Sequence, residues 1–196
     1  MNRQHGVVLL VALATSVALA YLSLTLVRAA FTSAAVVANA HARRAAMLAA
    51  STAIEADVNA LFRDRVVDTR ADDIAHNYYA SRQAGADARG VPSVLQSLAS
   101  YPADAAIIDV AHAFRVRHVV ERLCVAPGDA TLGNCTLSPP SVAAAQGRPP
   151  PGEPAREASF RINVRVDAIA GGTAFVQAIA SGAHPNPRLS WRALEE

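Results

Sequence analysis

The stretch from residue 7 to 26 limits what this chain can fold into more than any other feature. It holds about twenty residues without a charge, a proline or a glycine, and charge returns only at Arg28. An α-helix needs about twenty apolar residues to cross a hydrocarbon core of about 30 Å. We therefore expect a transmembrane or assembly helix over residues 7–27.

The helix-forming composition continues through an alanine-rich segment, residues 28–62. Ile54, Val58, Leu61 and Phe62 recur at i, i+4, i+7 and i+8 with polar residues between them, which is the pattern of an amphipathic helix. We expect this apolar stripe to pack beneath a sheet. Paired alanines either allow close approach of a second helix or favour helix formation; they are Ala34-Ala35, Ala45-Ala46 and Ala49-Ala50.

Residues 63–196 are expected to form one globular α+β domain. Mixed charges and the breakers Gly85, Gly90 and Pro92 in residues 63–102 predict loops with a short helix near 93–98. The aspartates of this segment lack the spacing of a calcium loop, so they are expected to lie on a solvated surface.

Alternating side chains predict three strands, at 114–125, 159–168 and 173–180. The last two are joined by a turn at 170–172 and form a hairpin. One face of this antiparallel sheet is expected to cover the helix stripe, and the arginine-bearing face to meet water. His118 falls on the apolar face, where we interpret it as a packing residue.

Two segments are not expected to form regular structure. Residues 136–158 contain six prolines and predict an exposed loop between strands, which serves either as a contact surface or as a spacer. The tail from His184 carries the single tryptophan, Trp191, which either folds back on the sheet or meets a partner.

Cys124 and Cys135 flank a segment rich in turn residues. In an exported domain, a disulfide between them is the natural interpretation. A zinc site lacks ligands, because neither a second pair of cysteines nor a histidine pair accompanies them. No metal or cofactor is predicted.

Charge and motif content exclude several functions. All eighteen basic residues are arginine, and they are scattered among sixteen acids, so no basic stripe for nucleic acid is formed. The chain has no nucleophile elbow, no phosphate-binding loop with lysine and no HExxH motif. We therefore expect no enzymatic activity.

The N-terminus allows three interpretations. Arg3 before the apolar run favours a cytoplasmic N-terminus, as in a plain membrane anchor. Residues 18–20 match the cleavage site of a secretory signal, although the sequence stays apolar and helical after it. The third is a type IV prepilin leader, residues 1–6, cleaved after Gly6.

The chain resembles the PilX-type minor pilins in three places. These are the residues around Gly6 and Val7, the segment from Val120 to Cys124, and the segment from Phe175 to Gln177, in the same order as in that family. The resemblance implies cleavage by prepilin peptidase after Gly6 and methylation at Val7. It further implies storage in the bacterial inner membrane with the lipid bilayer around the helix, then a place on the pilus at the cell surface.

The resemblance implies a function in initiating type IV pilus assembly within a tip-located minor pilin complex. Its partners would be other minor pilins, the major pilin, and the inner-membrane assembly machinery. One departure is Val11, which stands where most type IV pilins have a glutamate; a subunit without that carboxylate suits the first position in a filament. The alternatives are a minor pseudopilin of type II secretion and a membrane-anchored periplasmic domain without a pilus function.

Overall fold

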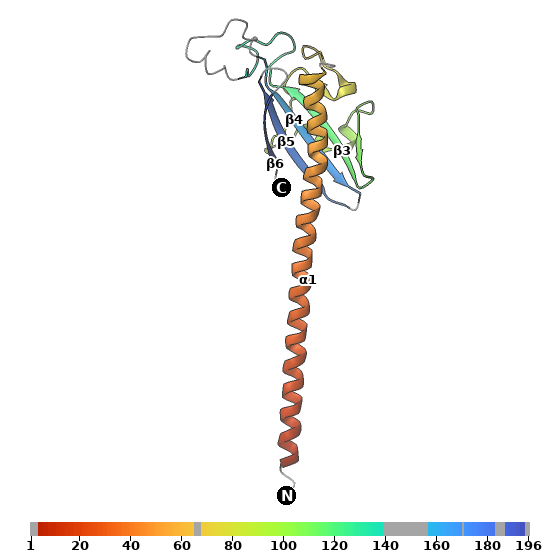
Figure 1. Cartoon of the computed structure of the whole chain (residues 1–196), viewed down its shortest axis with the longest axis vertical. Coiled ribbons are helices and arrows are strands. Elements are labelled where there is room, and N and C mark those ends of the chain that lie inside the picture. Colours follow the sequence, from red (N-terminus) through yellow and green to blue (C-terminus); the bar gives the residue numbers. More distant parts are fainter. Residues whose placement is uncertain (1–3, 65–67, 139–156, 170, 183–186, 195–196) are drawn as a thin grey trace. The chain divides into compact units, whose positions relative to one another are not determined.

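A computed structural model describes residues 4–64, 68–138, 157–169, 171–182 and 187–194 (Figure 1). A long helix, α1, spans Gln4–Val58 and is followed by a π-helical turn at Asn59–Arg63, which confirms the helix expected up to residue 62. The chain divides into two compact units. We call residues 1–44 the helix unit and residues 45–196 the sheet unit, and describe each by itself.

The sheet unit contains one six-stranded sheet of order β1-β3-β4-β5-β6, with β2 paired to β3. All neighbours are antiparallel except β1 and β3. This confirms the α+β class and the β4–β5 hairpin, whose turn uses Gly171 and Gly172 at positive φ. The strands are β1 Tyr78–Tyr79, β2 Ile108–Val110, β3 Phe114–Arg122, β4 Phe160–Ala168, β5 Thr173–Ser181 and β6 Arg188–Leu194.

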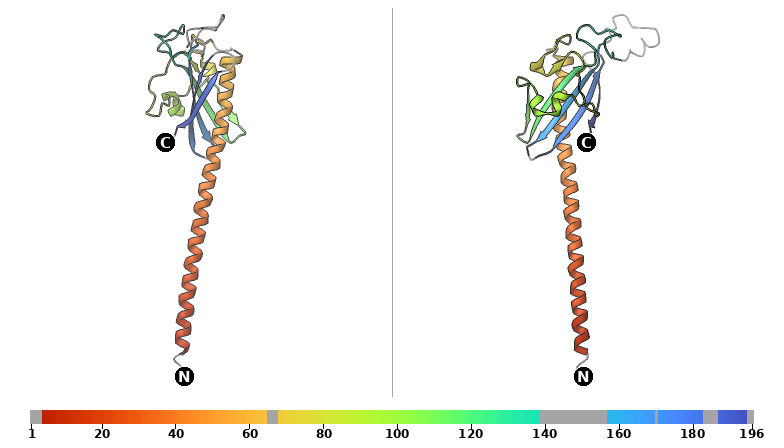
Figure 2. Two further views of the ribbon diagram at one scale, coloured as in Figure 1. Left: turned by 60° about the vertical axis from the view of Figure 1, so that its left-hand side comes forward. Right: turned by 180° about the vertical axis from the view of Figure 1, so that it is seen from behind.

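The C-terminal part of α1 covers one face of this sheet (Figures 1 and 2). Ile54, Leu61 and Phe62 are buried there and Val58 is partly buried, which confirms the predicted stripe. The Phe62 ring meets the Phe160 ring edge-on, with centroids 5.5 Å apart. Small side chains let the backbone of the helix approach the sheet closely, and four are buried: Ala46, Ala49, Ala50 and Ala53. These alanines, three of them in the predicted pairs, therefore pack on the chain's own sheet.

The opposite face of the sheet is also covered, so the expectation that it meets water was wrong. Val91 and Leu95 pack on Val119 of β3 in a second small core, and residues 80–101 lie over this face when the molecule is seen from behind (Figure 2). The arginines are neutralised rather than hydrated. Arg165 lies 2.9 Å from Asp167 and donates to the Leu95 carbonyl, and its guanidinium stands over the Phe175 ring.

The predicted short helix is present as α2, Ser93–Gln96, followed by a 3-10 turn at Leu98–Ser100. Strands β1, β2 and β6 were not predicted, and β6 shows that the tail with Trp191 folds back on the sheet. Of the predicted proline-rich loop, residues 139–156 lie outside the described residues; its two ends are joined by a bridge between Leu137 and Ala158.

Candidate functional site

The apolar part of α1 exposes its side chains throughout. Every described residue from Val7 to Arg28 is exposed. Within the described part of the chain, α1 is the one helix long and apolar enough to cross a membrane. It is therefore compatible with a single-pass membrane anchor; a secretory signal passes the same test of length and composition.

The serine and threonine side chains in this segment are satisfied within the helix itself. The hydroxyl groups of Thr15, Ser16, Ser23 and Thr25 each donate to a carbonyl three or four residues earlier, at 2.8 to 2.9 Å. In a bilayer no water is available to satisfy such groups. These four serine and threonine side chains are thus compatible with an apolar environment.

The residues predicted for processing lie consecutively on this helix. The backbone is helical from Gln4 through Gly6 and Val7 without a break, and the side chains of Val7 and Val11 are exposed. The sequence contains no acidic residue before Glu55. A positive charge near Val7 would therefore find no counterion among the first 54 residues.

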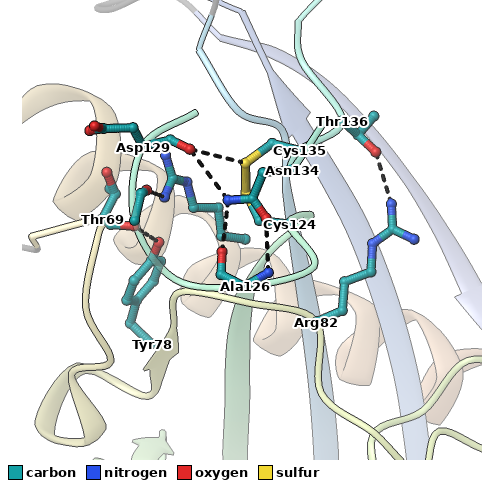
Figure 3. The surroundings of a disulfide bond; sticks show 11 residues. Thr69, Tyr78, Arg82, Cys124, Ala126, Asp129, Asn134, Cys135 and Thr136 are labelled. Carbon is teal, nitrogen blue, oxygen red and sulfur yellow. Dashed lines mark hydrogen bonds between the residues drawn. A yellow bond between two sulfur atoms is a disulfide. The ribbon is translucent and has the colours of Figure 1, made fainter. Parts of the chain in front are cut away.

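The predicted disulfide between Cys124 and Cys135 is present, with an S–S distance of 2.07 Å. It closes a loop that side chains also hold from within (Figure 3). The Asn134 side chain accepts from the Ala126 amide at 2.9 Å and donates to the carbonyls of Ala126 and Asp129. Arg122 donates to the Gly128 carbonyl. The loop is therefore fixed to the end of β3 at several points.

The motif residues from Val120 to Cys124 have structural roles at that end of β3. Glu121 is fully buried and forms an ion pair with Arg161 of β4. Burial raises the pKa of Glu121, and the hydrogen bond and charge of Arg161 oppose that rise. The segment thus links the sheet to the disulfide loop through Arg122 and Cys124.

The second motif, from Phe175 to Gln177, lies on β5. Phe175 is flanked by the guanidinium groups of Arg89 and Arg165, at 5.2 and 5.7 Å from the ring centroid. Gln177 donates to the Asn163 side chain at 2.9 Å and is buried. The Arg89 contact attaches residues 80–101 to the sheet and the other contacts join β5 to β4, so this motif also has a structural role.

A buried polar cluster joins α1 to the sheet, and sequence reasoning missed it. Asp57 of α1 lies 3.1 Å from the ring of His118 on β3, and the Asn77 amide lies 3.0 Å from the same ring nitrogen. All three side chains are buried. His118 was predicted as a packing residue, and it is buried as expected, but its partner is a carboxylate. The signal available in the sequence was Asp57, an acid within the apolar stripe.

This cluster predicts that acidification stabilises the sheet unit. Burial raises the pKa of Asp57, an effect that the hydrogen bond and charge of His118 only partly oppose. The folded state therefore binds the proton of the Asp57 carboxyl more tightly than the unfolded chain does. The free energy of unfolding falls as the pH rises from the ordinary carboxyl pKa through the raised pKa of the folded state. We expect Asp57→Asn to flatten this fall in urea unfolding measured across that range.

Glu55→Gln is the matched control, because Glu55 lies on the same helix with an exposed side chain. It should leave the slope of stability against pH unchanged. If Asp57→Asn kept the same slope as the wild type, the cluster would not be the source of the pH dependence.

The described residues form no candidate metal centre. No group of three or more histidine, cysteine, aspartate or glutamate side chains among them is placed to hold a metal ion. Comparison with protein-family models, with curated proteins and with solved structures finds no match to this chain. The candidate functional elements are thus the apolar helix and the surfaces of the sheet unit.

Proposed function

We propose that this chain is a minor pilin that helps to initiate type IV pilus assembly. Prepilin peptidase would cleave it after Gly6, and Val7 would become the methylated N-terminus. The mature chain would wait in the inner membrane and then join other minor pilins in a complex that primes the filament of major pilin. The inner-membrane assembly machinery would extract it.

The observation that carries this proposal is the change in character along one continuous helix. Its first part exposes apolar side chains, and its last part buries an apolar stripe under the sheet of the same chain. The apolar surface of such a helix would contact lipid before assembly and the helices of neighbouring subunits after it. Transfer between these surroundings keeps the side chains out of water, so extraction does not cost the full hydrophobic penalty.

Val11 and the lack of acids before Glu55 favour a position at the start of the filament. If the chain joined beneath another subunit, the N-terminal ammonium of that subunit above it would need a carboxylate from this chain, because an uncompensated charge is costly in apolar surroundings. This chain supplies none in that region. The same feature suits a capping pseudopilin of type II secretion, which remains the alternative.

Pilus counts in a strain that lacks this chain test the proposal. We expect few pili in that strain and restored pili when the wild-type chain is returned. Gly6→Val should fail to restore pili, because the chain would keep its leader. Ala20→Val is the matched control and should restore them, since it keeps the helix apolar and alters the residue that a secretory signal peptidase would recognise.

The opposite pattern would contradict the proposal. If Gly6→Val restored pili while Ala20→Val did not, the chain would be exported through a cleaved secretory signal. If pilus counts never changed but type II secretion stopped, the pseudopilin alternative would be correct. If neither process changed, the chain would be an anchored domain with another function.

A further inference from the structure

Strand β6 leaves one edge of the sheet open. It pairs along its whole length with β5, from Phe175 opposite Leu194 to Ser181 opposite Arg188. Among the described strands, none pairs with its other side. An unpaired edge presents a row of backbone N–H and C=O groups that a further strand can use.

The side chains of β6 on the helix side are apolar and exposed. Leu189 and Trp191 stand opposite Ala180 and Ala178, which are fully buried in the core under α1. Leu189 nevertheless remains 42% exposed and Trp191 52% exposed. The apolar face of the sheet thus continues past its own helix, and tryptophan is a residue on which binding energy often concentrates.

The other face of β6 carries two arginines without an acidic partner. Arg188 and Arg192 make no ion pair with any described side chain, and Arg192 donates only to the Gln177 side chain at 3.2 Å. Arginines of the inner strands differ, since Arg161 pairs with Glu121 and Arg165 with Asp167. Within the described part of the chain, the edge therefore has unmatched positive charge as well as unmatched hydrogen-bonding groups.

This charge disfavours a second copy of the chain in one antiparallel register, whereas in the register centred on Trp191 the arginines would meet Leu194 and Ser190. If two β6 strands paired antiparallel about Ser190, Arg188 of each would stand opposite Arg192 of the other. Like charges directly opposite one another destabilise such a pair. A strand with acidic residues at those positions would instead be attracted.

We propose that the open edge of β6 binds an extended segment of another protein as a seventh strand. The segment would alternate acidic and apolar residues, so that its acids meet Arg188 and Arg192 and its apolar side chains cover Leu189 and Trp191. Main-chain hydrogen bonds would supply affinity and the side chains specificity, as in other cases of strand addition. This inference does not depend on the function in pilus assembly.

The fluorescence of Trp191 tests it directly, because the chain has no other tryptophan. The full chain in mild detergent is titrated with a blocked nine-residue peptide that alternates glutamate and valine. We expect a blue shift of emission that saturates, since the peptide removes the indole from water. A peptide that alternates lysine and valine should bind at least about tenfold more weakly, given the charge pairs it reverses.

Two variants and a modified peptide complete the test. Charge reversal by Arg188→Glu with Arg192→Glu should invert the preference between the two peptides. Arg115→Glu is the matched control, because Arg115 is an exposed arginine on β3, which β4 and β5 separate from β6. It should leave the preference unchanged. The glutamate–valine peptide with methyl groups on alternate backbone nitrogens should not bind, because it cannot complete the ladder.

Each contrary result overturns the proposal. Equal binding of the methylated peptide would mean that only charge or aromatic contact is involved. Equal binding of the lysine and glutamate peptides, or no shift with either, would remove the acidic strand as occupant. A blue shift of the chain alone with rising concentration would show that a second copy covers this edge.

Discussion

Replacing Phe62 with alanine is expected to lower the free energy of unfolding of the sheet unit by about 3 to 5 kcal/mol. The Phe62 side chain is 1% exposed and lies between α1 and the sheet. Its ring meets Phe160 edge-on, and Phe160 in turn lies 6.3 Å from the ring of Tyr78. Truncation would remove both the buried area and this aromatic contact, and it would leave a cavity beneath β4.

Pulse proteolysis of the detergent-solubilised chain across a urea series measures this effect. Phe31→Ala is the matched control, because Phe31 lies in the helix unit with a side chain that is 72% exposed. It should leave the unfolding midpoint of the sheet unit unchanged. Equal losses from both variants, or no loss from Phe62→Ala, would contradict the packing of this helix on the sheet.

The double replacement Cys124→Ser and Cys135→Ser is expected to cost about 2 to 5 kcal/mol. The disulfide links residues eleven apart in sequence, and both cysteines are buried with Ala158. Next to the disulfide, the Thr136 amide donates to the Leu123 carbonyl and the Ser159 amide donates to the Thr136 carbonyl, each at 2.8 Å. Without the disulfide, the loop would loosen at the end of β3.

The same urea series under reducing and non-reducing conditions checks this expectation. Reduction of the wild-type chain should reproduce the loss, and it should have no effect on the double variant. Asn134→Ala serves as a second comparison, because it removes the amide contacts of the loop but keeps the disulfide. It should cost less than the double replacement. A double variant as stable as the wild type would show that the loop is held by its hydrogen bonds alone.

Strong periodicity and burial made some elements predictable from the sequence. Strand β4 alternates apolar and polar residues and is followed by a pair of glycines, and inward residues of the hairpin, such as Ile162 and Val176, are buried. The helix was predictable because nothing interrupts its composition for more than fifty residues. Both signals are local, so they survive without knowledge of the tertiary structure.

The elements that were missed lack such a signal. Strand β6 buries little surface, so its alternation of Leu189 and Trp191 with Arg188 and Arg192 did not resemble a core strand. Residues 80–101 pack on the sheet through a few contacts around Phe175, which come from segments far apart in the sequence. The pairing of Asp57 with His118 likewise depends on how the helix lies on β3.

For the candidate processing site, the prediction comes from the sequence and the structure adds little to it. Gly6, Val7 and Val11 were singled out by their order along the chain, and the structure adds that they share one unbroken helix. Cleavage depends on a partner enzyme and on the membrane, neither of which leaves a local geometric mark on the chain. The evidence on these residues must therefore come from the mature protein.

The most direct test of the proposed function is the mass and N-terminal sequence of the chain extracted from membranes, with and without prepilin peptidase. The account predicts a chain that begins at a methylated Val7 when the peptidase is present and at Met1 when it is absent. A mature chain that begins near Tyr21, or an intact Met1 under both conditions, would contradict it.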